Sequence, residues 1–340
     1  MTSRMHDEAH EAPQVAARLL AADEQVHRAL GAYLRTELPR AAVTVARGSS
    51  DHAAQYMAYL VMARLGQLVT SLPMSLVTLY PPRIACTGLV SWAFSQSGQS
   101  PDLVAPTRFF RAGGARTIAI VNDAGSPLAQ AAQWVLPLHA GAELSVAATK
   151  SFIAQLVVGA RMVAHWQDDP VLLAALADLP QALARATQAD WRPLVEALRG
   201  ADRLFVIGRA TGLSVAMEAA LKFKEVCGIQ AEAFSGAEVR HGPMALVDPG
   251  YPLLVIAPRG PAQAGLIALA EDMRARGGRV LLAAPAGTPG AELPLLPAAH
   301  EDLDPITAIQ SFYLAAEALA RERGLDPDRP RHLSKVTRTN

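Results

Sequence analysis

The chain has 340 residues, 51% of them hydrophobic and 18% charged, which is enough apolar material for a large buried core and too little charge for a disordered chain. Lysine plus arginine and aspartate plus glutamate number 31 each, so the net charge favours neither nucleic acid nor an anionic membrane as a partner. Two cysteines are too few for a disulfide framework. Without a signal-like start or an apolar run of ~18 residues, the sequence predicts a soluble cytoplasmic protein.

The first half of the chain alternates between apolar runs and helical patterns. Residues 1–37 have apolar positions at helical spacing and predict an N-terminal helical segment. Four apolar runs follow, AAVTV, GLVSWAF, RTIAIVN and WVLPL, each succeeded by a turn and most by a helical pattern. Strands that alternate with helices favour a parallel sheet covered on both faces, so residues 38–166 are predicted to be a first domain.

The second half repeats this layout. Residues 167–199 are rich in alanine and predict a helical linker. The run RLFVIGRATGLSVAMEAALKFKEVCG then repeats the order of buried strand, glycine turn and long helix, and opens a second domain over residues 200–325. Residues 326–340 form a polar tail. The predicted fold class is therefore α/β, with two tandem doubly wound parallel sheets and ligands expected at the carboxyl ends of the strands.

A serine-rich turn is a candidate phosphate site. Residues 95–100, SQSGQS, place three hydroxyls, two amides and a glycine between a strand and a helix. Main-chain N–H groups at a helix N-terminus bind phosphate without a lysine, and Gly98 allows close approach of the backbone. Ser49 and Ser50, in the turn after the first strand, can direct further hydroxyls to the same edge. The alternative is an ordinary polar loop that caps a helix.

Acidic and basic groups gather in residues 216–243. On a helix through Val215 to Cys227, the side chains of Glu218, Lys222 and Glu225 share one face because they are spaced by four and three residues. The helix must end at Gly228, and His241 follows on a glycine-bounded loop, where reactive groups are often presented. The alternative is a solvated ion-pair face followed by a turn.

Four motifs in the same order resemble one family. FSQSGQSPDL is similar to the signature of the sugar isomerase (SIS) fold. GAELSVAATKSF, the stretch from EAALKFKEVCG to RHGPMALVD, and HLSKVTRTN resemble the isomerase half of glucosamine-6-phosphate synthase and, more closely, single-chain type II glucosamine-6-phosphate deaminases and deglycases. No glutaminase region precedes the resemblance and position 2 holds no cysteine, so the resemblance implies an enzyme that does not make ammonia from glutamine.

The resemblance also implies the site residues. The phosphate-binding positions fall on Ser50, Ser95, Gln96, Ser97 and Ser100, and the sugar-lining positions on Val146 and Thr149. The reactive positions fall on Lys222, Glu225, His241 and Lys335. The chain departs from the synthase pattern at Gln99, Ser100 and Ala148, where the synthase has an acid, a threonine and a serine. We expect the phosphate contacts to survive these departures and the contacts to the hydroxyls or amine of the sugar to differ.

The chemistry implied is conversion of an amino-sugar 6-phosphate, above all glucosamine 6-phosphate, to fructose 6-phosphate and ammonia. His241 suits ring opening, Glu225 the proton shuttle between C1 and C2, and Lys222 the stabilisation of an oxygen or the enolamine. Lys335, on a tail expected to close as a lid, suits a Schiff base or a cation beside the carbonyl oxygen. The resemblance implies a homodimer in which His241 serves the neighbouring subunit. We expect no cofactor and no metal.

Three other functions stay open. A deglycase that removes an amino acid from a phosphorylated sugar-amine adduct shares the same proton transfers. An aminotransferase-type isomerase without glutaminase would run between the same two sugars. A regulator that binds sugar phosphates is the non-enzymic alternative, but such regulators need a DNA-binding helix-turn-helix and a basic surface, and this chain has some 37 residues before its first strand and no net charge.

Overall fold

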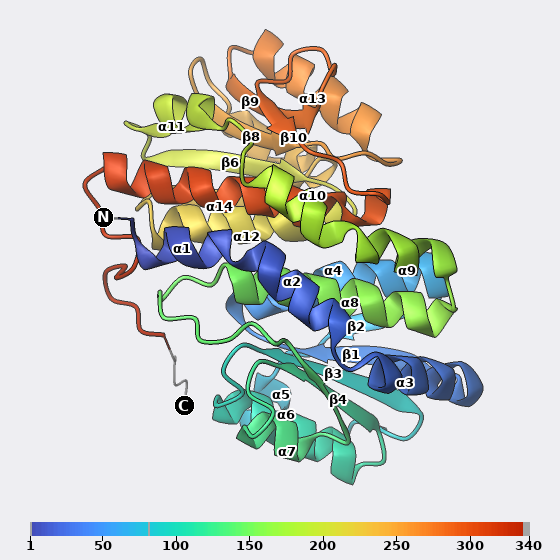
Figure 1. Ribbon diagram of the computed structural model, residues 1–340. Helices are drawn as coiled ribbons and strands as arrows, with labels where there is room; N and C mark the ends of the chain where they lie inside the picture. The colour runs from blue at the N-terminus through green and yellow to red at the C-terminus, as the bar shows by residue number, and fades with distance from the viewer. Residues whose placement is uncertain (1, 81, 336–340) are drawn as a thin grey trace. The chain divides into compact units, whose positions relative to one another are not determined.

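The computed structural model describes residues 2–80 and 82–335, which divide into two compact units, each built around one sheet (Figure 1). The first-sheet unit comprises Gln14–Glu143, Lys150–Ala177 and the residues from Ser334. The second-sheet unit comprises the residues up to Pro13, Leu144–Thr149 and Asp178–Leu333. The domain bounds given by the sequence pattern stay a prediction, and each unit is described separately below.

The first sheet has five parallel strands in the order β2-β1-β3-β4-β5. The strands are β1 (Ala41–Val45), β2 (Val69–Ser71), β3 (Leu89–Ser95), β4 (Arg116–Val121) and β5 (Trp134–Pro137). The chain leaves β1 for β2 on one side and returns to β3 on the other, so the strand order reverses at β1 and β3. In doubly wound sheets this reversal opens a crevice at the carboxyl ends of the two strands, where ligands bind.

The second sheet repeats this order as β10-β9-β8-β6-β7, with all strands parallel. The strands are β6 (Arg203–Gly208), β7 (Gln230–Ser235), β8 (Pro252–Ile256), β9 (Arg279–Pro285) and β10 (Leu293–Leu295). Here the order reverses at β6 and β8. The predicted α/β fold with two tandem doubly wound parallel sheets is confirmed.

Helices complete both units. Three short helices open the chain, α1 (Arg4–His10), α2 (Ala12–Ala21) and α3 (Glu24–Glu37), where the sequence pattern predicts a helical segment. The others used below are α4 (Gly48–Leu65), α6 (Pro101–Ala112), α8 (Lys150–Gln167), α12 (Thr211–Glu225) and α14 (Asp304–Glu322). The remainder are α5 (Ser75–Thr78), α7 (Pro127–Ala131), α9 (Pro170–Ala177), α10 (Leu179–Ala186), α11 (Arg192–Leu198), α13 (Gln263–Ala275) and the 3₁₀ turns η1 (Glu238–His241), η2 (Pro243–Leu246) and η3 (Glu301–Leu303).

Continuous apolar strands explain why both sheets are covered on both faces. Along β4 every residue after Arg116 is buried, and along β9 five consecutive residues are buried. Such runs cannot face water on either side, which is the usual pattern of parallel sheets. The short edge strands β2 and β10 lack this pattern, and the sequence analysis does not predict them. Within the described part of the chain, the helices are too short or too polar to cross a membrane.

Candidate functional site

The serine-rich turn lies where the first sheet reverses its strand order. Residues 95–100 connect the end of β3 to the start of α6, and Ser49 and Ser50 lie in the first turn of α4, directly after β1. Because β1 and β3 are parallel neighbours, both turns lie at the same edge of the sheet. Gln96, Ser97 and Ser100 are half-buried, as are Ser49 and Ser50. The structure of this unit thus brings all of the predicted phosphate-binding residues to one crevice edge.

Glycine is required at the centre of this turn. Gly98 has a φ of +66°, and a Cβ atom there would approach Ser126 Oγ to 2.2 Å and Val121 Cγ2 to 2.8 Å. The N–H of Gly98 donates to Ser95 Oγ at 2.9 Å, and the N–H of Gln99 donates to Ser97 Oγ at 3.3 Å. The hydroxyl of Ser95 is buried and helps to fold the turn. Ser95 therefore shapes the site in addition to any contact with a ligand.

Helix α8 connects the first-strand turn to Lys335. Gln155 Nε2 donates to Ser50 Oγ at 2.9 Å. One turn earlier, Ser151 donates its N–H and its hydroxyl to the carboxylate of Glu143, at 3.1 and 2.6 Å. The same carboxylate pairs with Lys335 Nζ at 2.8 Å. The N-terminal end of α8 therefore holds both a predicted phosphate-binding serine and, through the fully buried Glu143 side chain, the predicted reactive lysine.

Three charged side chains form a cluster along α12 in the second-sheet unit. Lys222 Nζ lies 3.4 Å from Glu218 Oε1 and forms a second ion pair with Glu225. The side chains of Glu218 and Lys222 are 0% and 1% exposed, whereas that of Glu225 is 20% exposed. Burial alone would lower the pKa of Lys222, but Glu218 and Glu225 outweigh it and raise the pKa above its ordinary value. Lys222 is therefore a protonated ammonium held between two carboxylates.

Glu225 borders a small cavity of the second-sheet unit. The cavity has a volume of about 190 Å³ and is also lined by the segment that follows α14, including Asp326, Arg329 and Arg331. Of the three charged side chains on α12, that of Glu225 is the one partly exposed to solvent. A carboxylate with one buried cation behind it and an open side in front has the geometry of a group that exchanges protons with a ligand.

His241 lies away from this cluster within the same unit. Helix α12 begins three residues after β6 and ends five residues before β7, so Glu225 lies toward the amino ends of these parallel strands. His241 is in η1, which follows the carboxyl end of β7, and it is exposed. The length of α12, about 20 Å at 1.5 Å per residue, separates the two ends. His241 thus lies at the edge of the sheet where the strand pattern predicts ligands, whereas Glu225 lies toward the opposite edge.

The predicted sugar-lining segment is fixed by two residues that the sequence analysis did not identify. The carboxylate of Glu8, on α1, accepts hydrogen bonds from the N–H of Leu144 and from the N–H and hydroxyl of Ser145. The N–H of Val146 donates to the carbonyl of Asp328 at 3.4 Å. Val146 is half-buried and Thr149 is buried. An acidic residue in a leading helix carries no sequence signal for such a role, because its partners lie some 136 residues away.

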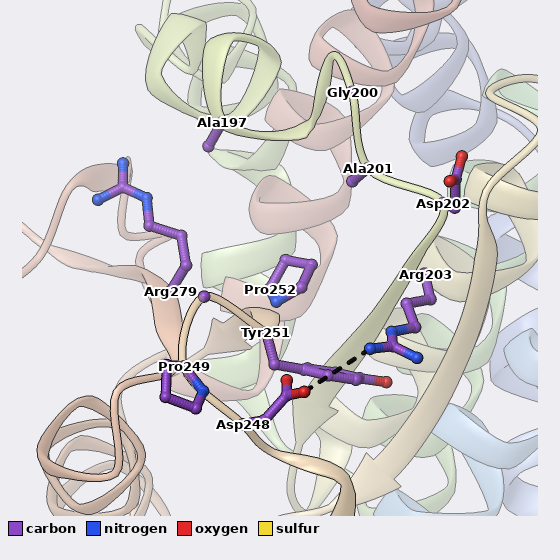
Figure 2. A pocket seen from close by; sticks show the side chains of 11 residues that line it. Ala197, Gly200, Ala201, Asp202, Arg203, Asp248, Pro249, Tyr251, Pro252 and Arg279 are labelled. Carbon is purple, nitrogen blue, oxygen red and sulfur yellow. Dashed lines mark ion pairs between the residues drawn. The ribbon is translucent and has the colours of Figure 1, made fainter.

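A second cavity of the second-sheet unit lies at the amino ends of its strands (Figure 2). Its volume is about 570 Å³, and its lining includes Arg203 and Arg279, the first residues of β6 and β9. The guanidinium of Arg203 lies over the ring of Tyr251, 5.1 Å from the centroid, and 4.0 Å from Asp248 Oδ2. The lining of this cavity includes none of the predicted reactive residues Lys222, Glu225, His241 and Lys335. Among residues 2–80 and 82–335, no group of three or more histidines, cysteines or acids could hold a metal ion.

Two parallel five-stranded sheets of identical order define a doubly wound α/β protein, and a serine-rich turn lies where the first sheet reverses its strand order. The chain belongs to the SIS domain family, which matches residues 39–164 and 197–295, and the resemblance seen in the four motifs is confirmed. The glutamine–fructose-6-phosphate aminotransferase [isomerizing] of Aeropyrum pernix is 36% identical over 313 residues, which are 86% of this chain and 50% of the relative. The chain spans about half the length of the curated relatives it matches.

Solved structures agree with this assignment. A candidate phosphosugar isomerase from Silicibacter pomeroyi DSS-3 superposes with a TM-score of 0.91 at 42% identity, covering 96% of this chain and 100% of that chain. The glucosamine-6-phosphate deaminase of Thermotoga maritima superposes with a TM-score of 0.79 at 21% identity, covering 99% of this chain and 100% of that chain. The second likeness concerns the fold alone.

Proposed function

We propose that this protein is a phosphosugar isomerase that acts on an amino-sugar 6-phosphate. The reaction that fits best converts glucosamine 6-phosphate and water to fructose 6-phosphate and ammonia. The observation that carries this proposal is the Glu225 carboxylate, which is backed by the buried ammonium of Lys222 and open toward a cavity. The serine turn at the strand-order reversal, together with relatives described as acting on hexose phosphates, supports a phosphosugar as the substrate.

Each step of the proposed reaction needs one proton transfer or one charge. The serine turn would hold the phosphate through hydroxyl and main-chain N–H groups. His241 would open the sugar ring, and Glu225 would take the proton from C2 and return it to C1. Hydrolysis of the resulting imine adds one water and releases one ammonia. Lys222 would stabilise the negative charge on the enolamine or its oxygen, and Lys335 would approach the carbonyl carbon or its oxygen.

The proposal includes a homodimer with shared active sites. Glu225 and His241 lie toward opposite ends of α12 within the second-sheet unit. The fold of this unit therefore does not bring the two residues of one subunit together. The exposed His241 is available to another chain. We therefore propose that His241 completes the site of a partner subunit. Size-exclusion chromatography with light scattering tests the dimer, and activity regained on mixing Glu225→Gln and His241→Asn subunits tests the sharing.

Product analysis tests the reaction. The protein would be incubated separately with glucosamine 6-phosphate, galactosamine 6-phosphate and fructoselysine 6-phosphate, and ammonia, lysine and fructose 6-phosphate would be measured. Ammonia and fructose 6-phosphate from glucosamine 6-phosphate support the proposal. Lysine release would instead identify a deglycase. Formation of glucosamine 6-phosphate that depends on fructose 6-phosphate and an amine donor would identify an aminotransferase-type isomerase.

A binding measurement separates an enzyme from a regulator. Isothermal titration calorimetry with the same three sugar phosphates and with fructose 6-phosphate reports affinity independently of turnover. Tight binding without turnover of any of them would contradict the proposed activity and leave a sugar-phosphate sensor. Turnover that survives in Glu225→Gln would contradict the role of Glu225 while leaving the reaction in place.

A further inference from the structure

A line of polar groups runs from the interior of the second-sheet unit to the cavity at Glu225. Tyr313, on α14, donates its hydroxyl to Glu218 Oε1 at 3.1 Å. The same oxygen lies 3.4 Å from Lys222 Nζ, which in turn pairs with Glu225. Helices α12 and α14 pack side by side (Figure 1), so Tyr313 meets Glu218 from the neighbouring helix. Tyr313 and Glu218 are both fully buried.

The burial of Glu218 needs an explanation. A buried carboxylate and a buried ammonium each cost several kcal/mol of desolvation, and replacing such a pair by apolar side chains is often neutral or stabilising. Stability alone therefore does not account for Glu218. Glu225 already forms an ion pair with Lys222, so Glu218 is a second carboxylate beside an ammonium that is already paired.

The acidic groups around Lys222 all favour its protonated form. Glu218 and Glu225 face the ammonium from its own helix and oppose the lowering of its pKa by burial. Helix α14 adds the phenol of Tyr313, which acts through Glu218. Two carboxylates and one ammonium give the cluster a net charge of −1, with the open side at Glu225. A proton that Glu225 accepts there would make the cluster neutral.

We propose that Glu218 and Tyr313 are positioning residues that keep Lys222 protonated and fixed behind Glu225. Glu218 supplies the charge that holds the proton on Lys222, and Tyr313 fixes the orientation of the Glu218 carboxylate. Neither residue touches the substrate. This inference rests on the proposed function of Lys222 as a cation and of Glu225 as the proton shuttle.

The dependence of kcat/KM on pH tests the role of Glu218. The wild-type protein should keep its activity to about pH 10, because the pKa of an unperturbed lysine is about 10.4 and that of Lys222 is higher. Glu218→Gln removes one opposite charge at constant shape, so the alkaline loss of activity should move about 1 to 3 pH units lower. The matched control is Glu196→Gln, which removes an exposed carboxylate from α11 of the same unit and should leave the profile unchanged.

Two further results distinguish this inference from the proposed function. If Glu225→Gln is inactive and a folded Glu218→Gln retains the wild-type alkaline limb, Glu218 does not hold the proton on Lys222 and the inference is wrong. Tyr313→Phe removes one hydroxyl and should lower kcat while leaving KM within about twofold, since the phosphate contacts are untouched. This variant decides the question if Glu218→Gln does not fold. An unchanged kcat in Tyr313→Phe would mean that no interaction passes from Tyr313 through Glu218 to Lys222, and would overturn the proposal.

Discussion

The turn after β3 offers a ligand hydroxyls, amides and main-chain N–H groups, whereas α12 offers it carboxylates and an ammonium. Ser97 and Ser100 need no buried partner to stay in place, because the turn is fixed by Gly98 and by hydrogen bonds within residues 95–99. Lys222 does need buried partners, because an isolated ammonium in the interior would lose its proton. Two sheets of the same strand order thus carry an uncharged serine-rich turn in one unit and a charged cluster in the other.

This difference indicates where each unit can tolerate change. A neutral turn binds an anion through geometry, so it should be sensitive to backbone shape and insensitive to pH. A charged cluster works through ionisation, so it should be sensitive to single charges and tolerant of small shifts in shape. The sheet itself determines neither property, since both sites lie outside the strands.

The largest expected effect comes from Glu225. Glu225→Gln keeps the size of the side chain but removes the proton acceptor, and loss of a general acid or base lowers turnover by about 10²- to 10⁴-fold. The affinity for sugar phosphates should stay within a few-fold of the wild type, because the residues proposed to bind the phosphate belong to the other unit. Steady-state kinetics and calorimetry measure the two quantities. A variant that binds poorly and turns over normally would reverse the division of roles between the two units.

A smaller effect is expected from the shape of the binding turn. Gly98→Ala places a Cβ against Ser126 and Val121 at a φ of +66°. A left-handed conformation costs a non-glycine residue about 1–2 kcal/mol, and overpacking adds about 1–3 kcal/mol. Together these costs begin at about 2 kcal/mol, so we expect KM for the sugar phosphate to rise about 30-fold or more, with kcat changed less.

Gly48→Ala is the matched control for this turn. Gly48 also has a positive φ, +53°, but no atom lies within 4 Å of the added Cβ. Gly48→Ala should therefore carry the energetic cost of a left-handed alanine without a steric clash, and KM should rise by less than in Gly98→Ala. Equal effects in the two variants would mean that backbone conformation, and not contact with Ser126, controls the turn.

Sequence alone could predict the parts of both sites that depend on neighbours along the chain. The helical spacing of Glu218, Lys222 and Glu225 places them on one face, and the structure joins them in ion pairs. The apolar runs and the glycine turns predict the long strands and the position of the serine turn.

The remaining features depend on packing between distant segments. Tyr313 meets Glu218 across 95 positions, and one tyrosine in an apolar helix gives no sign of this contact. Strand β2 has two exposed residues among its three, so no apolar alternation marks it. Glu225 lies toward the amino ends of the strands because it is on the returning helix and not on the turn that follows a strand. The roles of the site residues and the domain bounds stay predictions.

Acid sensitivity should arise in the first-sheet unit, away from the binding turn. Burial, reinforced by the charge of Arg161, lowers the pKa of His27 from 6.5 to about 4. Between these two values the unfolded chain binds a proton that the folded chain does not, so stability falls as the pH decreases from 6.5 toward 4. The loss is at most about 3.4 kcal/mol, at 1.36 kcal/mol for each pH unit.

His27→Gln should remove most of this slope. Burial also lowers the pKa of His165, so the variant should keep part of the acid sensitivity. Hydrogen exchange of first-sheet amides at pH 7 and pH 5, measured by mass spectrometry, compares the two proteins. The wild type should lose more protection than the variant at pH 5, while the affinity for sugar phosphate at pH 7 stays the same in both. An identical loss in both proteins would show that His27 is not the group that titrates.

The smallest effect is expected at the cavity lined by Arg203 and Arg279, which has three times the volume of the one beside Glu225. Its arginines are exposed: the side chain of Arg203 is 63% exposed, and its ion pair with Asp248 has an N–O distance of 4.0 Å. Exposed pairs of this kind contribute about 0–1 kcal/mol. Arg203→Ala should therefore leave kcat/KM within twofold of the wild type. A loss of tenfold or more in kcat/KM would assign this cavity a part in the reaction, and burial of charge would then be a poorer guide to function here than cavity size.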